Sequence, residues 1–276
     1  MSPARPPEGA NSLPEGQGRR PKGAPLSPAR PPEGANSLPE GQGRRPKGAP
    51  VSPASVVDHL VVAAATLEQG VQWCEATFGV TPGPGGTHAL MGTHNRLIRL
   101  AGSQYSRSYL EIIAIDPQAA APERARWFDL DDHRLRDAIR IQPRLVHFVA
   151  RCGDARGAVQ ALRERGLELG ELVRAERRTT TGLLQWGITM RADGQRLFHG
   201  ALPALIEWAG AHPTDAMPVS GVELLGLTAR HPRVHELQAA HAAVGLQGVG
   251  LREGEADLAA VFAAPAGRVT LHSAGV

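Results

Sequence analysis

Twice in this chain, a histidine is followed fifty to sixty residues later by a glutamate, each inside an apolar segment typical of a β-strand. The first pair is His59 in VVDHLVV and Glu111 in YLEIIAI, and the second is His147 in LVHFVA and Glu207 in ALIEW. Such side chains are costly in apolar surroundings unless something binds them. Imidazole nitrogens and carboxylate oxygens together suit Zn, Ni, Fe or Mn. The doubled pattern therefore predicts one divalent-metal site held by all four residues.

Strand geometry indicates how these four side chains would meet. Side chains alternate between the two faces of a strand. The apolar residues on either side of His59 would pack on a helix, which leaves His59 on the opposite, concave face. The same reasoning, applied to Glu111, His147 and Glu207, predicts that all four converge on the floor of a curved sheet.

Hydrophobic periodicity and turn residues predict the same order of elements, β-α-β-β-β, around each pair. The first unit, 56–116, is expected to hold a strand over 56–63, a helix from Thr66 to Phe78, and strands around His88–Met91, Asn95–Leu100 and 109–115. The second unit, 145–215, is expected to hold a strand over 145–151, a helix over 154–165, strands near 172–179 and 183–190, and the Glu207 strand. Residues 117–144 read as a connector with a helix that Asp132 caps.

A third unit, 220–276, repeats this order in shorter form. Its first strand carries Glu223 where the other units carry histidine, and its last strand offers no matching glutamate. We therefore expect a module that binds no metal and serves as packing or dimer surface. The fold class expected for the whole is α+β, with paired βαβββ modules forming a cupped mixed sheet and a third, partial module beside them.

The N-terminal segment, 1–55, differs sharply from the rest. Residues 2–26 are repeated almost unchanged as residues 27–51, and the segment is rich in Pro and Gly. It cannot bury enough apolar surface to offset its chain entropy, so it reads as a disordered tail, with the true start of the protein near Val51 or Val56. It holds six Arg and two Lys against four Glu, whereas the remainder holds 22 basic and 23 acidic residues. The folded part thus gives no electrostatic reason to bind nucleic acid or a membrane.

Several chemistries are excluded or disfavoured by composition. Both lysines, Lys22 and Lys47, lie in the tail, which excludes Schiff-base chemistry and a Walker-type phosphate loop in the folded part. Two cysteines form no disulfide framework, and no apolar run approaches the length of a membrane span. A cytoplasmic protein is expected. Histidines in connectors and helices, such as His212, His231 and His241, read as surface residues.

The segments DHLV, GTHNRL, YLEIIA and PALIEW, which begin at Asp58, Gly92, Tyr109 and Pro203, resemble the glyoxalase-like branch of the vicinal oxygen chelate superfamily. The resemblance covers roughly residues 56–215. It implies paired βαβββ modules in a cup around one divalent metal, with His59, Glu111, His147 and Glu207 at the ligand positions. The superfamily includes isomerases, lyases, epimerases, ring-cleaving dioxygenases and metal-free drug-binding proteins.

The function expected from the residues and the resemblance is a metal-dependent isomerase or lyase. The metal would chelate neighbouring oxygens of a small substrate, and Glu207 or Glu111 would move a proton next to a carbonyl. His94, Asn95 and Arg99 are the expected substrate contacts. Two alternatives stay open: an Fe(II)-dependent dioxygenase of the same fold, and a non-catalytic, metal-free protein that binds a small or drug-like molecule. The expected partner is a small-molecule substrate, and a homodimer is possible.

Overall fold

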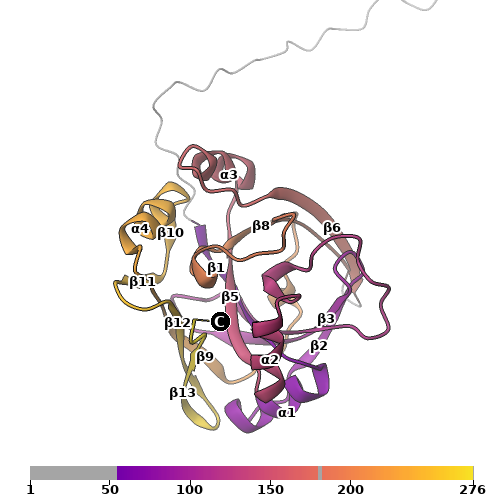
Figure 1. The fold of residues 1–276 in the computed structure, drawn as a ribbon. Helices are drawn as coiled ribbons and strands as arrows, with labels where there is room; N and C mark the ends of the chain where they lie inside the picture. The colour runs from indigo at the N-terminus through magenta and orange to yellow at the C-terminus, as the bar shows by residue number, and fades with distance from the viewer. Residues whose placement is uncertain (1–54, 180–181, 276) are drawn as a thin grey trace, which may run out of the picture. The chain divides into compact units, whose positions relative to one another are not determined.

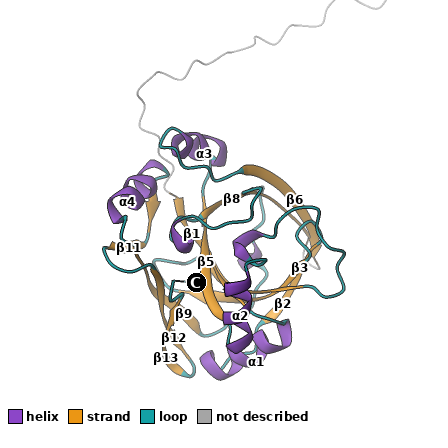
Figure 2. Cartoon of the chain, in the orientation of Figure 1, coloured by secondary structure: helices purple, strands orange, loops and turns teal. Residues whose placement is uncertain are grey.

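The computed structural model describes residues 55–179 and 182–275 of the 276-residue chain. The duplicated N-terminal segment, predicted to be a disordered tail, lies outside the described residues up to residue 54. The described part contains thirteen strands in one mixed sheet, with short helices packed against it (Figure 2). The predicted α+β class with paired βαβββ modules is confirmed.

The first module follows the predicted order β-α-β-β-β. Its elements are β1 (Ser55–Ala63), α1 (Leu67–Phe78), β2 (Gly83–His88), β3 (Thr93–Ala101) and β4 (Ser108–Ile115). Thr66 caps α1 by accepting a hydrogen bond from the Gln69 N–H, and Gly79 ends the helix with a φ of 71°. The helix therefore begins one residue after its predicted start and ends at its predicted end.

The strand predicted around His88–Met91 was misplaced. The structure puts β2 at Gly83–His88, inside a Gly- and Pro-rich stretch that was expected to be a loop, and residues 89–92 form a turn. The pairing of β2 with β3 is irregular between Pro84 and Thr87. A Cβ atom on Gly85 would lie 2.1 Å from the backbone oxygen of Asn95, so this close approach of the two backbones requires glycine.

The connector and the second module follow in the chain. The connector holds η1 (Trp127–Asp129) and α2 (His133–Ile141), and Asp132 caps α2 as predicted. The second module consists of β5 (Arg144–Arg151), α3 (Ala155–Arg163), β6 (Glu171–Thr179), β7 (Gly182–Met190), η2 (Phe198–Gly200) and β8 (Ala204–Trp208). The short helix η3 (Pro213–Asp215) lies between β8 and the third module.

The third module repeats the order in shortened form. It consists of β9 (Val222–Arg230), α4 (Val234–Ala243), β10 (Leu246–Gln247), β11 (Val249–Arg252), β12 (Asp257–Ala264) and β13 (Gly267–His272). Parallel pairing of Leu100 with Val222 joins β9 to β3, so this module extends the sheet beyond the first one. Figure 1 shows α4 of this module beside α3 of the second.

Strand order places the two modules that carry the His/Glu pairs side by side in one sheet. The sheet runs β13-β12-β9-β3-β4-β1-β5-β8-β7-β6, and β1 pairs antiparallel with β5 at its centre. A large apolar core on one face, which includes Leu60, Ile112 and Phe148, packs the helices onto the sheet. A smaller core on the other face includes Val61 and Ile113. We call this second face the cup, and it is the face on which His59 and Glu111 were predicted to lie.

Candidate functional site

A β-bulge at Asp58 determines how β1 presents its polar residues. In the pairing with β5, Val57 lies opposite Ala150 and His59 lies opposite Val149, so Asp58 is an extra residue with no partner. A bulge of this kind re-aims side chains and is common beside active sites. It interrupts the strand's alternation, and Asp58 contacts the ring of His59 directly.

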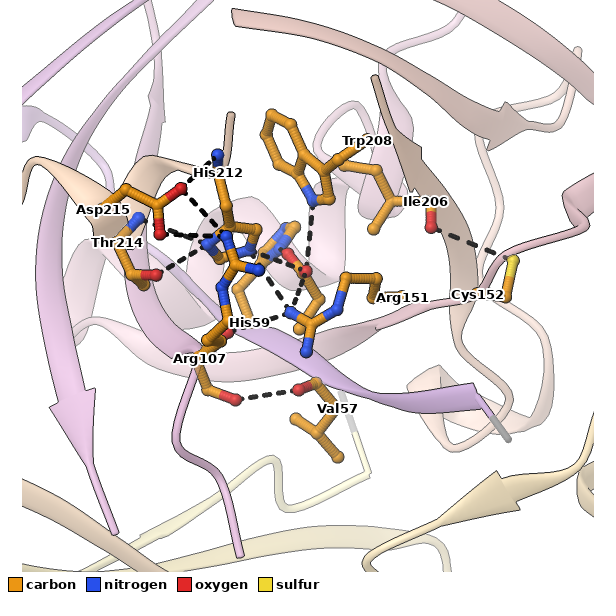
Figure 3. Close-up of polar contacts among 12 residues, drawn as sticks. Val57, His59, Arg107, Arg151, Cys152, Ile206, Trp208, His212, Thr214 and Asp215 are labelled. Atoms are coloured by element: carbon orange, nitrogen blue, oxygen red, sulfur yellow. Dashed lines mark hydrogen bonds and ion pairs between the residues drawn. The ribbon is translucent and has the colours of Figure 1, made fainter. Parts of the chain in front are cut away.

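Asp58 is fully buried and accepts hydrogen bonds from four side chains. Nδ1 of His59 lies 2.8 Å from Oδ1, while Nε2 of His212, Nη1 of Arg151 and Nε1 of Trp208 lie 3.0 to 3.1 Å from Oδ2. Figure 3 shows these four side chains pointing toward one carboxylate. Burial opposes ionisation, but the hydrogen bonds from His212 and His59 outweigh it and hold the pKa of Asp58 far below its usual range. Asp58 is therefore an ionised carboxylate, which can accept hydrogen bonds but cannot donate one.

The ionised Asp58 fixes the tautomer of His59. Because the carboxylate has no proton to give, Nδ1 of His59 must carry the hydrogen of their 2.8 Å bond. The other ring nitrogen, Nε2, then faces away from Asp58 toward Glu111, 3.6 Å from Oε2. A carboxylate behind a histidine in this way holds the ring in place. Tyr109 stacks on the ring at 4.5 Å between centroids.

Glu111 is oriented by Asn95, which was predicted to contact substrate. The Asn95 Oδ1 accepts from the Gly86 N–H at 2.7 Å, so its amide nitrogen is turned toward Glu111 Oε1, 2.5 Å away. The same amide nitrogen lies 3.3 Å from Nε2 of His88. Burial lowers the pKa of His88 against the opposing charge of Glu111, so its ring is neutral and Nε2 accepts this second bond. Glu111 thus keeps Oε2 without a hydrogen-bond partner among the described residues.

These groups line a cavity of about 40 Å³ in the cup. Its wall also contains Trp127, Phe128, Trp186 and Arg177. Trp127 and Phe128 belong to η1 of the connector, where Phe128 and Asp129 both have a φ of 58°. This backbone conformation is costly outside glycine and turns the buried Phe128 ring into the cup, 5.1 Å from the ring of His147.

His147 lies on the cup face but both of its ring nitrogens have backbone partners. Nδ1 donates to the Gly200 carbonyl at 3.1 Å, and Nε2 accepts from the Ala204 N–H at 3.0 Å. Burial, with a further contribution from Arg196, lowers the pKa of His147 to about 3. The ring is a neutral link between η2 and β8, and neither nitrogen is directed at His59 or Glu111.

Glu207 lies on the other face of the sheet, which corrects its predicted position in the cup. Ile206 and Trp208 are on the cup side, with Ile188 and Trp186 as their partners on β7. Glu207 instead shares a face with Leu205, which is fully buried in the helix-side core. The strand has apolar residues on both faces, so alternation alone could not decide which face is concave.

The other two predicted substrate residues lie away from the cavity. His94 is on the face opposite Asn95, 4.0 Å from Asp116. Arg99 shares the face of Asn95 but donates to the Met217 carbonyl at 3.2 Å, in the segment after β8. Of the seven residues predicted for the site, the structure brings His59, Glu111 and Asn95 into contact around one cavity.

Sequence reasoning missed the residues that support this cluster. Asp58 sits beside His59 in the chain, and its burial next to a strand histidine is a readable signal once a bulge is considered. Tyr109 is two residues before Glu111 and therefore on the same face. His212, His231 and His241 were expected on the surface, but all three are buried. His212 is only 2% exposed. Only tertiary structure places the loop that carries His212 beside β1.

The cavity offers few donor atoms to the expected divalent metal. Among the His, Asp and Glu side chains of the described residues, only His59 Nε2 and Glu111 Oε2 offer the cavity an unused lone pair, because His147 is bonded twice, Glu207 faces away and His88 accepts from Asn95. Catalytic zinc takes three protein ligands, and structural zinc takes four. In the described residues no three His, Cys, Asp or Glu side chains are grouped to hold a metal. The arrangement does not fit the four-ligand centre.

Comparison with known proteins gives a family and a fold. A family model described as a glyoxalase-like domain matches residues 57–245. No curated protein matches the chain in sequence. No helix in the described part of the chain is long and apolar enough to cross a membrane.

One solved structure with a TM-score above 0.5 shows the same fold at low identity. A hypothetical protein from Staphylococcus aureus is 11% identical with a TM-score of 0.52, over 74% of this chain and 88% of that one. Methylmalonyl-CoA epimerase from Mycobacterium tuberculosis is 17% identical with a TM-score of 0.34, over 58% of this chain and 91% of that one. The Streptomyces coelicolor epimerase in complex with 2-nitronate-propionyl-CoA is 18% identical with a TM-score of 0.36, over 58% and 100%.

Proposed function

This chain belongs to the glyoxalase-like domain family, and we propose that its cup catalyses proton transfer next to the carbonyl of a small oxygenated molecule, as an isomerase or lyase. The observation that carries the proposal is the pair formed by His59 Nε2 and Glu111 Oε2, 3.6 Å apart in a buried cavity. Each atom has an unused lone pair, and each side chain is held from behind, by Asp58 and by Asn95 respectively. Groups held in this way act as general bases with little reorganisation.

Glu111 and His59 would transfer protons at different atoms of the substrate. Glu111 Oε2 takes a proton from the carbon beside the carbonyl and returns it to the neighbouring carbon. His59 Nε2 takes the proton of the adjacent hydroxyl and returns it to the former carbonyl oxygen. Each group ends the cycle in its starting state, and the net change is a shift of the carbonyl by one carbon. Tyr109 packs on the His59 ring, and burial raises its pKa well above 10, so its hydroxyl stays protonated.

Hydrogen–deuterium exchange provides the test, because it requires only the first proton transfer. The protein is incubated in D₂O with hydroxyacetone, dihydroxyacetone or glycolaldehyde, and loss of the C–H signal next to the carbonyl is followed by NMR. We expect wild type to accelerate exchange, and Glu111→Gln and His59→Gln to reduce the rate by roughly 10² to 10⁴. Glu223→Gln, an exposed glutamate on β9, is the matched control and should retain the wild-type rate.

Two results would contradict this function. One is no acceleration by wild type with any of the three compounds, and the other is equal rates in wild type and Glu111→Gln. Each measurement is repeated after EDTA treatment and with added Zn²⁺ or Mn²⁺. Retention of activity after EDTA is expected from the donor set, whereas strict dependence on added metal would show that the site rearranges to bind one.

The aromatic wall supports a second candidate, a non-catalytic protein that binds a small molecule. Trp127, Phe128 and Trp186 line the cavity, and aromatic walls supply much of the contact area in such sites. Ligand binding by wild type and Glu111→Gln, without exchange in either, would favour this candidate. The dioxygenase alternative needs two histidines and a carboxylate around one metal. In the part of the chain that the structure describes, only His59 offers a free histidine nitrogen beside Glu111, so the site does not fit this alternative.

A further inference from the structure

Arg177 on β6 is a cation without a partner in the wall of the catalytic cavity. It lines the cavity together with His59 and Glu111, and the other lining residues include no second Arg or Lys. Its guanidinium lies against the backbone of β2, since a Cβ atom on Gly86 would fall 2.1 Å from Nη1. Within residues 55–179 and 182–275 it forms no ion pair, and its Nε is buried without a hydrogen bond. A buried donor left in this state carries a desolvation cost.

A second unpaired donor belongs to another residue of the cavity wall. Nε1 of Trp127 is buried and has no hydrogen-bond partner among the described residues. Its ring meets the ring of His88 edge to face at 4.9 Å between centroids, so the indole is packed in the wall. Buried indole N–H groups usually have a partner, so this N–H is available to an acceptor atom of a ligand.

The size of the space narrows the chemistry of that ligand. A cavity of about 40 Å³ corresponds to roughly three water-sized spheres, which is the size of a group with three heavy atoms. Planar guanidinium groups bind carboxylates through two parallel hydrogen bonds, and an indole N–H donates to the same class of acceptor. A carboxylate thus satisfies both donors, whereas a neutral apolar group leaves both unpaired.

We propose that the cup recognises a substrate that carries a carboxylate, bound by the guanidinium of Arg177 and by Nε1 of Trp127, with its reacting carbon toward Glu111. This inference rests on the proposed function and adds a substrate class to it. It assigns the substrate class as small carbonyl compounds with a carboxylate group. The positive charge of Arg177 offsets the repulsion that such a substrate meets from Glu111.

Binding of propanoate and of propanamide tests the assignment without turnover. The two compounds have the same number of heavy atoms and nearly the same shape, and only the first is an anion. Titrations are followed by tryptophan fluorescence, to which Trp127 and Trp186 contribute from the cavity wall. We expect propanoate to bind wild type more tightly than propanamide. Arg177→Gln should weaken propanoate binding by about tenfold to a hundredfold and leave propanamide binding unchanged.

Arg178→Gln is the matched control, because it removes the same charge from the next residue of β6, which is exposed. Its propanoate affinity should stay within about twofold of wild type, since a charge at an exposed site contributes little. Trp127→Phe keeps an aromatic ring, although a smaller one, and removes the N–H, and should weaken propanoate binding by several fold, read from Trp186. If Arg177→Gln does not fold, Arg177→Lys is used, which keeps the charge without the planar fork and should give intermediate weakening.

The outcomes separate this inference from the proposed function. Equal affinities of wild type for propanoate and propanamide, or unchanged propanoate binding in Arg177→Gln, would overturn the inference even if proton exchange on neutral ketones is observed. Propanoate binding that depends on Arg177 and survives in Glu111→Gln supports the inference even if no exchange occurs.

Discussion

The first and second modules carry the same two residue types on corresponding strands, and the structure uses them differently. Each histidine follows a bulge in the pairing of β1 with β5, at Asp58 in one strand and at Val146 in the other. Asp58 accepts a hydrogen bond from Nδ1 of His59, which leaves Nε2 facing the cavity. Val146 offers no such acceptor, and His147 bonds to backbone groups through both nitrogens.

This difference shows that the residue beside each histidine, more than the histidine itself, sets its role. A carboxylate partner leaves one nitrogen free for chemistry. Backbone partners on both sides make the second ring a structural link that fixes η2 against β8. The repeat therefore preserves the fold in both halves, and the free acid–base groups lie in one half.

The largest effect is expected from removing Asp58. Asp58→Ala leaves buried donors of His59, His212 and Trp208 without an acceptor, and Arg151 Nη1 keeps only the Arg107 carbonyl. Breaking a buried network of this kind costs about 3–5 kcal/mol in the free energy of unfolding. Urea denaturation measures the loss. Asp137→Ala, at an exposed pair on α2, is the control and should cost less than about 0.5 kcal/mol.

If the two variants lose the same stability, Asp58 does not anchor the first module. The role assigned to the bulge would then be untenable.

The second effect is a loss of stability at acidic pH, to which the neutral His147 contributes. Its folded pKa of about 3 lies below the ordinary value of 6.5, so the unfolded chain binds the proton first as the pH falls. The stability it contributes is complete above pH 6.5 and is lost from there toward pH 3, by about 1.4 kcal/mol per pH unit. Wild type should therefore lose about 2 kcal/mol more than His147→Gln between pH 7 and pH 5.

Urea denaturation at the two pH values provides this comparison. The control is His133→Gln at the exposed start of α2, which should follow wild type. Asp58 does not contribute in this interval, because its lowered pKa confines its loss of stability to pH values below the ordinary 3.8. Equal acid sensitivity in wild type and His147→Gln would show that the ring is not held neutral by burial.

The fold was largely predictable from the sequence, whereas the site was predictable only in part. Periodicity and caps such as Thr66 and Asp132 are local signals, and they located most helices and strands. The assumption that the polar residue of a strand lies on the concave face was right for His59 and Glu111, although β1 and β4 are apolar on both faces. It failed for Glu207, where both faces of β8 are apolar.

The partners that decide the chemistry come from distant parts of the chain. His212 reaches Asp58 across 154 residues and Trp208 across 150. Gly200 and Ala204 are more than fifty residues from the His147 ring that they bond. Such contacts leave no local pattern in one sequence. The bulges at Asp58 and Val146 are equally hidden, because they depend on how two strands pair.

A smaller effect should show whether His59, next to Glu111, is neutral or a cation. In Glu111→Gln, the new amide keeps an oxygen for Asn95 and turns its N–H₂ toward Nε2 of His59, so an acceptor–acceptor contact becomes a hydrogen bond. The variant should gain about 1 kcal/mol in its free energy of unfolding while losing exchange activity. Glu223→Gln should show neither change. A loss of stability in Glu111→Gln would instead indicate that His59 is a cation held between Asp58 and Glu111.

The smallest effect is expected at Glu207, the residue that matches Glu111 in the second module. Glu207→Gln changes a partly exposed side chain on the helix-side face of β8, and no hydrogen bond or ion pair in the described residues depends on it. We expect a change in unfolding free energy within about 0.5 kcal/mol, because isolated surface charges contribute little. The exchange rate should stay within about twofold of wild type. A loss comparable to that of Glu111→Gln would mean that β8 turns Glu207 into the cup during catalysis, and that both halves act together.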